Sequence, residues 1–447
     1  MDKFHNDIGV CVPEILLPNK SVDMQKWAVV ACDQYTSQPD YWKETEEIVG
    51  EAPSTLRIML PEFYLDKPDE AQRIEAINAA MDAYMADGVL QSIGQGLMLV
   101  RRHVDGKTRL GLMIALDLER YSYEKGSKTL IRATEGTIVE RIPPRLRIRK
   151  DAPLEMPHIL VLIDDPEKTV IEPLEADADK ASLQYDFTLM QGGGDVKGWF
   201  IKNEAAIERT LNAMAALVDP AKFAKQYGDD QPPLLFAMGD GNHSFATAKA
   251  SWENIKATLS PAQRETHPAR FCLVELENVH DAGIIFEPIH RVLFHLDADK
   301  ALEYLQSKLS ADNGGCELMT FGARAQAEQA AKQAAQDDAH VLPFVTPSAF
   351  GFLKVTAPAA QLAVGTLQNA LDAMLKDMPG VVIDYIHGED VVYELGAQAQ
   401  NMGFLLPPMP KGQLFPTVVF DGALPRKTFS MGEANEKRFY LECKKIK

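Results

Sequence analysis

Long apolar runs, paired cysteines and an excess of basic residues are all missing from this chain of 447 residues. No stretch approaches the ~18 uninterrupted apolar residues of a membrane-spanning helix, so we expect no membrane partner. The five cysteines are widely scattered and show no C-x-x-C spacing, which is typical of free thiols in a reducing compartment. The N-terminus has no basic region followed by an apolar run, so we expect no signal peptide and a cytoplasmic protein.

Positive charge is also scarce. Acidic residues number 64 against 46 basic ones, which gives a formal net charge of −18. Such a surface repels a phosphate backbone, so we expect no nucleic-acid partner. An anionic ligand would need a local positive site.

Sequence motifs that would identify a specific catalytic site are absent as well. The chain has no G-x-x-x-x-G-K-[ST], no H-E-x-x-H and no G-x-S-x-G, and no G-x-G-x-x-G follows a strand. The sequence therefore supports neither a Walker nucleotide site nor a hydrolase with one of these signatures. It predicts no metal site built by protein groups alone.

The composition, with 46% hydrophobic and 25% charged residues, is that of a globular protein. Short apolar or β-branched runs alternate with amphipathic helical stretches, which predicts a multi-domain α/β protein with mixed (α+β) sheets. The composition of the chain becomes Ala-rich beyond Asp297. We therefore expect a main α/β domain over residues 1–297, with a sub-boundary near 150, and a smaller α+β domain over 298–447. The sequence leaves the oligomeric state open, a homo-oligomer included.

Two local patterns give further predictions. The apolar run Trp27–Cys32 predicts a buried strand. Asp105-Gly106 lies between the runs Leu97–Val104 and Thr108–Leu116 and indicates a β-hairpin.

The most informative segment has the sequence GDGNHS, residues 239–244. It follows an apolar run and precedes a helical pattern, so it predicts a strand, a tight turn and a helix. Backbone N–H groups at such a helix start, together with the helix dipole, bind anions. Gly239 and Gly241 would let the backbone approach a phosphate, Asn242 and Ser244 would add contacts, and Asp240 and His243 are candidate acid–base groups. The alternative is a structural turn in which Asp240 or Asn242 caps the helix.

Other candidates fall into four groups. Arg132 and Arg141 flank Glu135, which combines cations for a phosphate with a carboxylate able to take a hydroxyl proton. The remaining candidates for substrate contact are Asp33, Tyr35, His290, Arg291, Arg426 and Lys427. Three of the groups have a structural alternative: solvated charges near Glu135, a satisfied core histidine at His290, and ion pairing with the acidic surface near the C-terminus.

Taken together, several segments resemble one family. They are WAVVACDQYTSQPDYW (27–42), APSTLR (52–57), RATEGTIVERIPPR (132–145), GDGNHS (239–244), FEPIHRVLF (286–294), IDYIHGED (383–390) and LPRKTFSMGEANEKRFYLE (424–442). On these motifs the chain is identified as a member of the domain-of-unknown-function 1015 family of bacterial and archaeal proteins. Members commonly carry Asp-Gly-His-His-Arg where this chain has Asp240-Gly241-Asn242-His243-Ser244, so the arginine that could clamp a phosphate is missing here.

The Asp-Gly-His-His-Arg pattern is in turn similar to the loop of the ParB and sulfiredoxin superfamily, which includes nucleotide-binding switches and a free-serine kinase. This resemblance implies a loop that holds the phosphates of a nucleotide or phosphorylated small molecule, with Mg²⁺ carried in by ATP or ADP. It implies a small-molecule phosphotransferase acting on serine or a similar hydroxyl compound. A nucleotide- or metabolite-binding module without turnover is the alternative, favoured by the departures at Asn242 and Ser244.

Overall fold

The computed structural model describes residues 4–124, 126–179, 182–335 and 339–447, which form two compact units. Unit 1 comprises Met1–Ile285 and Met431–Lys447, and unit 2 comprises Phe286–Ser430. The sequence predicts a domain boundary near residue 297, whereas the chain enters unit 2 at Phe286 and its last segment belongs to unit 1. The physical reason is burial: Phe439, Leu441 and Cys443 complete the core of unit 1.

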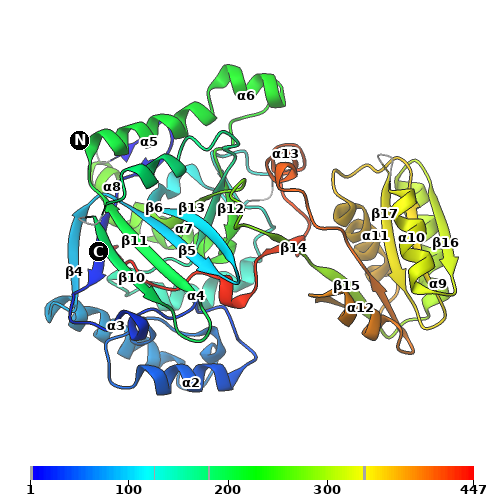
Figure 1. The fold of residues 1–447 in the computed structure, drawn as a ribbon, viewed down its shortest axis with the longest axis horizontal. Helices are drawn as coiled ribbons and strands as arrows, with labels where there is room; N and C mark the ends of the chain where they lie inside the picture. The colour runs from blue at the N-terminus through cyan, green and yellow to red at the C-terminus, as the bar shows by residue number, and fades with distance from the viewer. Residues whose placement is uncertain (1–3, 125, 180–181, 336–338) are drawn as a thin grey trace. The chain divides into compact units, whose positions relative to one another are not determined.

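Unit 1 is built on a ten-stranded mixed sheet with the central order β10-β11-β5-β6-β13-β9-β12-β7, and β2 and β1 continue from β6 (Figure 1). The strands of unit 1 are β1 (Phe4–His5), β2 (Val10–Cys11), β3 (Glu14–Pro18), β4 (Leu90–Gln95), β5 (Leu97–Val104), β6 (Lys107–Asp117), β7 (Ile131–Arg132), β8 (Leu154–Glu155), β9 (Leu160–Ile163), β10 (Leu183–Thr188), β11 (Asp195–Ile201), β12 (Phe236–Asp240), β13 (Phe271–Asn278) and β22 (Lys444–Lys445). Its helices are α1 (Met24–Trp27), α2 (Pro39–Val49), α3 (Glu70–Ala86), α4 (Ile142–Arg149), α5 (Glu204–Leu217), α6 (Pro220–Tyr227), α7 (Asn242–Lys256) and α8 (Pro261–Thr266).

Both faces of this sheet are buried, because successive side chains of a strand point to opposite faces. On β5, Leu97 and Leu99 join the core that contains the apolar faces of α5 and α7. Met98 and Val100 join the second core, which contains residues of α2, α3 and the C-terminal segment. The predicted hairpin is confirmed, since β5 and β6 pair antiparallel around Asp105-Gly106.

The sequence predicts a strand at Trp27–Cys32, and this prediction is wrong. Trp27 ends helix α1, and Ala28, Val29, Val30 and Ala31 are buried but join no sheet. They form only a single bridge, from Val30 to Phe439 of the C-terminal segment. The apolar run therefore reflects burial under another segment rather than a place in a ladder.

Unit 2 contains a six-stranded antiparallel sheet with the order β16-β18-β17-β20-β15-β19. Helices α9 to α12 pack against it. The elements are β14 (Phe286–Pro288), β15 (His290–Phe294), α9 (Ala298–Asp312), β16 (Cys316–Phe321), α10 (Arg324–Ala334), β17 (His340–Val345), β18 (Phe350–Val355), α11 (Ala363–Asp377), β19 (Val382–Ile386), α12 (Glu389–Gly396), β20 (Asn401–Phe404), α13 (Leu414–Asp421) and β21 (Phe429–Met431), whose last residue already belongs to unit 1. The fold class predicted from the sequence, mixed α/β in more than one unit, is confirmed.

Within the described parts of the chain, no helix is long and apolar enough to cross a membrane.

Candidate functional site

The GDGNHS segment is the predicted strand, turn and helix. Strand β12 ends at Asp240, Gly241 adopts the left-handed conformation with φ +76°, and α7 begins at Asn242. The helix is held in place by its apolar face, on which Phe245, Ala248 and Trp252 are buried. This anchoring fixes the first turn of α7 at the end of β12.

Both glycines of the GDGNHS segment have close neighbours. A Cβ on Gly241 would lie 3.1 Å from the Cα of Ile159, and the positive φ strains any other residue. A Cβ on Gly239 would lie 2.5 Å from the Sδ of Met431. The two glycines thus bring the turn tightly against the neighbouring backbone and side chains of unit 1.

The side chains at the start of α7 hold the segment 134–138. The Oδ1 of Asn242 accepts a hydrogen bond from the backbone N–H of Thr134 (3.3 Å), and the Nε2 of His243 accepts one from Ile138 (3.2 Å). The hydroxyl of Thr134 donates to the carbonyl of Met238 at 2.7 Å. Neither Asn242 nor Asp240 caps α7, which begins without a side-chain cap. The turn and the segment that carries Glu135 therefore form one structure.

Asp240 forms an ion pair with Lys437, whose Nζ lies 3.1 Å from Oδ2. Burial alone would raise the pKa of Asp240. The ammonium group of Lys437, the neighbouring His158 and the backbone N–H of Gly241 outweigh it and hold the pKa below its usual value. Asp240 is therefore ionised at neutral pH.

A second cluster lies beside the turn and centres on His158, which is 8% exposed. Its Nε2 lies 2.8 Å from the Oγ of Ser244 and 3.8 Å from the Oδ2 of Asp33. Its Nδ1 lies 2.8 Å from the hydroxyl of Tyr440. The structure thus brings Asp33, a residue singled out for substrate contact, together with Ser244 of the turn.

His158 and Tyr440 were not singled out from the sequence. Strands β9 and β12 pair antiparallel, with Leu160 opposite Asp240, so residues that precede β9 lie beside residues that follow β12. That pairing places His158 next to Ser244. The one sequence signal that could have found His158 is its position just before an apolar strand, and this signal is shared by many residues.

The candidates in the basic segment near the turn make mostly structural contacts. Arg132 is 3% exposed and donates to the carbonyls of Thr129, Pro232 and Pro233. Arg141 is exposed, and its carbonyl accepts a hydrogen bond from Arg145. Glu135 is partly exposed between the two anchored positions of its segment. Of the two arginines, only Arg141 presents its side chain to solvent.

Tyr35 stacks on Tyr41 with ring centroids 3.7 Å apart. Burial and the nearby Glu433 raise the pKa of Tyr35, so its hydroxyl is neutral at physiological pH. Its backbone has φ +52°, which is uncommon for a residue other than glycine. The side chain belongs to unit 1, like the turn.

The four other candidates lie in unit 2. The Nδ1 of His290 accepts a hydrogen bond from the N–H of Leu406 at 3.0 Å. Arg291 is fully buried and donates to Gln368 and to the carbonyls of Ile289, Arg426 and Lys427. The guanidinium of Arg426 pairs with Asp372 at 2.9 Å. His290 and Arg291 thus make contacts within the core of unit 2, and Arg426 forms a surface ion pair in the same unit.

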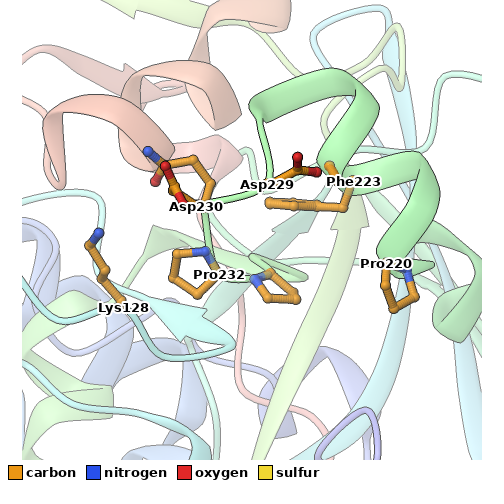
Figure 2. A pocket seen from close by; sticks show the side chains of 9 residues that line it. Lys128, Pro220, Phe223, Asp229, Asp230 and Pro232 are labelled. Atoms are coloured by element: carbon orange, nitrogen blue, oxygen red, sulfur yellow. The ribbon is translucent and has the colours of Figure 1, made fainter.

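A pocket of about 550 Å³ lies elsewhere in unit 1, and Figure 2 shows it. No residue singled out from the sequence lines it. Its lining residues are Lys128, Pro220, Phe223, Ala224, Asp229, Asp230, Gln231, Pro232 and Pro233. In the described ranges, no group of three or more His, Cys, Asp or Glu side chains is placed to hold a metal ion.

Comparison with protein families confirms the family that the sequence motifs indicated. Residues 16–374 match the family described as "Protein of unknown function (DUF1015)". The chain belongs to this family. No curated protein matches the chain.

Among solved structures, the chain is similar to a conserved hypothetical protein from Pyrococcus furiosus, with 10% identity and a TM-score of 0.35 over 74% of this chain and 90% of that one. It is also similar to a free serine kinase in complex with AMP, with 9% identity and a TM-score of 0.37 over 75% and 92%. A third is SbnI with C-terminal truncation from Staphylococcus aureus, with 10% identity and a TM-score of 0.34 over 72% and 82%.

Proposed function

We propose that unit 1 binds the phosphate groups of a nucleotide or a phosphorylated metabolite at the N-terminus of α7 and acts as a small-molecule phosphotransferase. The observation that carries this proposal is the start of α7. The helix begins without a side-chain cap, because its N-cap residue is Gly241, and Asn242 and His243 direct their acceptors to the segment 134–138. A helix start of this kind favours negative charge through its backbone N–H groups and its dipole.

The roles of the nearby side chains follow from their protonation states. Asp240 is held ionised by Lys437, and its depressed pKa makes it a poor proton acceptor at neutral pH. It suits the coordination of a Mg²⁺ ion that arrives with ATP or ADP, because Mg²⁺ is bound through one or two carboxylates and the phosphates themselves. Glu135 is the group that would take the proton of a substrate hydroxyl.

His243 then acts on the position of Glu135 rather than on the substrate, since its Nε2 already accepts the N–H of Ile138. Arg141, exposed just beyond that segment, would supply a cation for the transferred group. Phosphoryl transfer depends mainly on positioning and charge neutralisation, which this set of groups offers. The acceptor would be serine or a similar hydroxyl compound.

Thermal-shift titration with ATP, ADP, AMP, CTP, pyrophosphate and phosphoserine, each with Mg²⁺, tests the binding step. A ligand at ~100 times its Kd raises the free energy of unfolding by about 2.7 kcal/mol, which is readily measured. We expect one nucleotide to stabilise the wild type and Glu135→Gln, and to lose this effect in Asp240→Asn. Asp186→Asn, which changes an exposed carboxylate paired with Lys197, is the matched control and should behave as wild type.

Turnover is then measured with the nucleotide that binds and a panel of hydroxyl compounds headed by serine. Glu135→Gln should bind the nucleotide but form product at least ~100-fold more slowly. If no phosphate compound stabilises the protein, the proposal is wrong and the turn is structural.

A second candidate is a binding module without turnover. Two points favour it: the carboxylate of Asp240 is engaged by Lys437, and Ser244 stands where the family resemblance implies an arginine. Saturable nucleotide binding with no product across the panel would decide for this function.

A further inference from the structure

Ser244 and His158 form a hydroxyl–imidazole pair that the proposed function does not use. The Oγ of Ser244 lies 2.8 Å from the Nε2 of His158. The serine is partly exposed in the first turn of α7, whereas the histidine beneath it is buried. A hydroxyl within hydrogen-bond reach of a base that a third group orients is the arrangement of an activated nucleophile.

Tyr440 is the third group. Its hydroxyl lies 2.8 Å from the Nδ1 of His158 and accepts a hydrogen bond from the backbone N–H of Cys32 at 3.2 Å. The two rings meet edge to face, with centroids 5.7 Å apart and planes at 80°. In the tautomer that carries its proton on Nδ1, the imidazole donates to Tyr440 and its Nε2 is free to take the proton of Ser244.

The charges around the pair favour that proton transfer. The Oδ2 of Asp33 lies 3.8 Å from the same Nε2, so it stabilises the imidazolium once it forms. Asp240, a second carboxylate near the turn, is neutralised by Lys437. The negative charge that opposes an incoming phosphate is therefore reduced.

We propose that Ser244 is a phosphoacceptor: the chain transfers the terminal phosphoryl group of a nucleoside di- or triphosphate to the Oγ of its own Ser244. This inference rests on the proposed binding of nucleotide phosphates at α7. The bond between Oγ and the terminal phosphorus forms, and the bond from that phosphorus to the bridging oxygen breaks. The hydroxyl proton passes to the Nε2 of His158, and the shortened nucleotide leaves with the bond's electron pair.

The product of this transfer, phosphorylated Ser244, would be stabilised by its position. A phosphoserine in the first turn of a helix is stabilised by the helix dipole and by the backbone N–H groups of that turn. The phosphorylated side chain would then either hold the turn in one state or pass its phosphoryl group to a small-molecule hydroxyl.

The test is intact-protein mass spectrometry of the full chain after incubation with ATP or ADP and Mg²⁺, followed by peptide mapping. We expect wild type to gain one phosphoryl group on Ser244, Ser244→Ala to gain none, and His158→Gln to react at least ~100-fold more slowly. Ser260→Ala is the matched control, because Ser260 also lies at a helix start but contacts Gln263 instead of a histidine. It should be labelled like wild type.

Nucleotide binding is measured on the same samples by equilibrium dialysis, and folding by thermal unfolding. Binding without a phosphoryl group on Ser244 overturns this inference and leaves the proposed function standing. Absence of binding overturns both. Labelling that persists in Ser244→Ala also overturns it, as does reaction of Ser244 with a fluorophosphonate but with no nucleotide, which would indicate acyl transfer instead.

Discussion

The ammonium nitrogen of Lys437 lies 3.1 Å from the Oδ2 of Asp240, so the C-terminal segment of unit 1 supplies the counter-ion of the GDGNHS turn. The side chains are 10% and 25% exposed. A pair at this depth is more strongly coupled than one on the open surface. The turn therefore depends on a segment that is remote in sequence.

Replacing Lys437 with Met should lower the free energy of unfolding at pH 7 by about 1.5–3 kcal/mol, the usual range for a hydrogen bond to a charged group. The folded-state pKa of Asp240 is depressed, so its stabilising contribution is present above the unfolded pKa of about 3.9 and is lost as pH falls through the folded value. Urea denaturation from pH 7 downwards should show wild type and Lys437→Met converging at acid pH.

The exposed pair of Lys197 and Asp186 provides the comparison, with side chains 41% and 45% exposed. Lys197→Met should change the free energy of unfolding by less than about 1 kcal/mol. An equal loss in both variants would contradict the role of the Lys437–Asp240 pair.

Gly241 and Gly106 have nearly the same backbone angle, φ +76° and +74°, but different surroundings. A Cβ at Gly106 would meet nothing within 4 Å, whereas one at Gly241 would lie 3.1 Å from the backbone of Ile159. Gly106→Ala should cost about 1 kcal/mol from the backbone alone. Gly241→Ala should cost about 1–3 kcal/mol more, because backbone cannot move aside as a flexible side chain can. Chemical denaturation of the two variants measures the difference.

His243→Ala should loosen the segment that carries Glu135. The variant removes the acceptor for the N–H of Ile138, a bond worth about 0.5–1.5 kcal/mol, so exchange of that amide should speed up roughly 2- to 10-fold. Hydrogen exchange resolved to single amides measures this rate. Asn242→Ala is the reciprocal control: it should expose the amide of Thr134 and spare that of Ile138. Unchanged exchange at Ile138 would show that His243 does not hold the segment.

His290→Asn should make the protein less sensitive to mild acid. Burial, with Arg291 and His387 nearby, lowers the pKa of His290 to about 4. The unfolded chain takes up this proton near pH 6.5, so wild type loses stability as pH falls from about 6.5 to about 4, by roughly 3 kcal/mol in all. Asparagine can still accept the N–H of Leu406 through Oδ1 but does not titrate. Urea denaturation across this window should give a flatter profile for the variant, and identical slopes would refute the assignment.

Local features of the fold could be predicted because their causes lie within a few residues. The hairpin of β5 and β6 follows from alternating apolar residues around Asp105-Gly106, both of which have positive φ. The turn between β12 and α7 likewise follows from an apolar run, a glycine and a helical pattern. The family membership rests on motifs that are read directly from the sequence.

Contacts between distant segments could not be predicted. Arg132, expected beside a phosphate, donates to backbone carbonyls instead, because the chain around Pro232 and Pro233 lies against it. The C-terminal segment, expected in the smaller domain, returns to unit 1, because its apolar residues complete that core. Composition and periodicity carry no information about which segment covers which.

The amino-acid sequence alone determined the mixed α/β class, the family and the turn at residues 239–244. Only the tertiary structure decided which side chains surround that turn. The antiparallel pairing of β9 with β12 sets His158 beside Ser244, and the returning C-terminal segment sets Lys437 beside Asp240 and Tyr440 beside His158. Backbone turns are governed by neighbouring residues, whereas a site assembled from several segments depends on strand pairing and core packing across the whole unit.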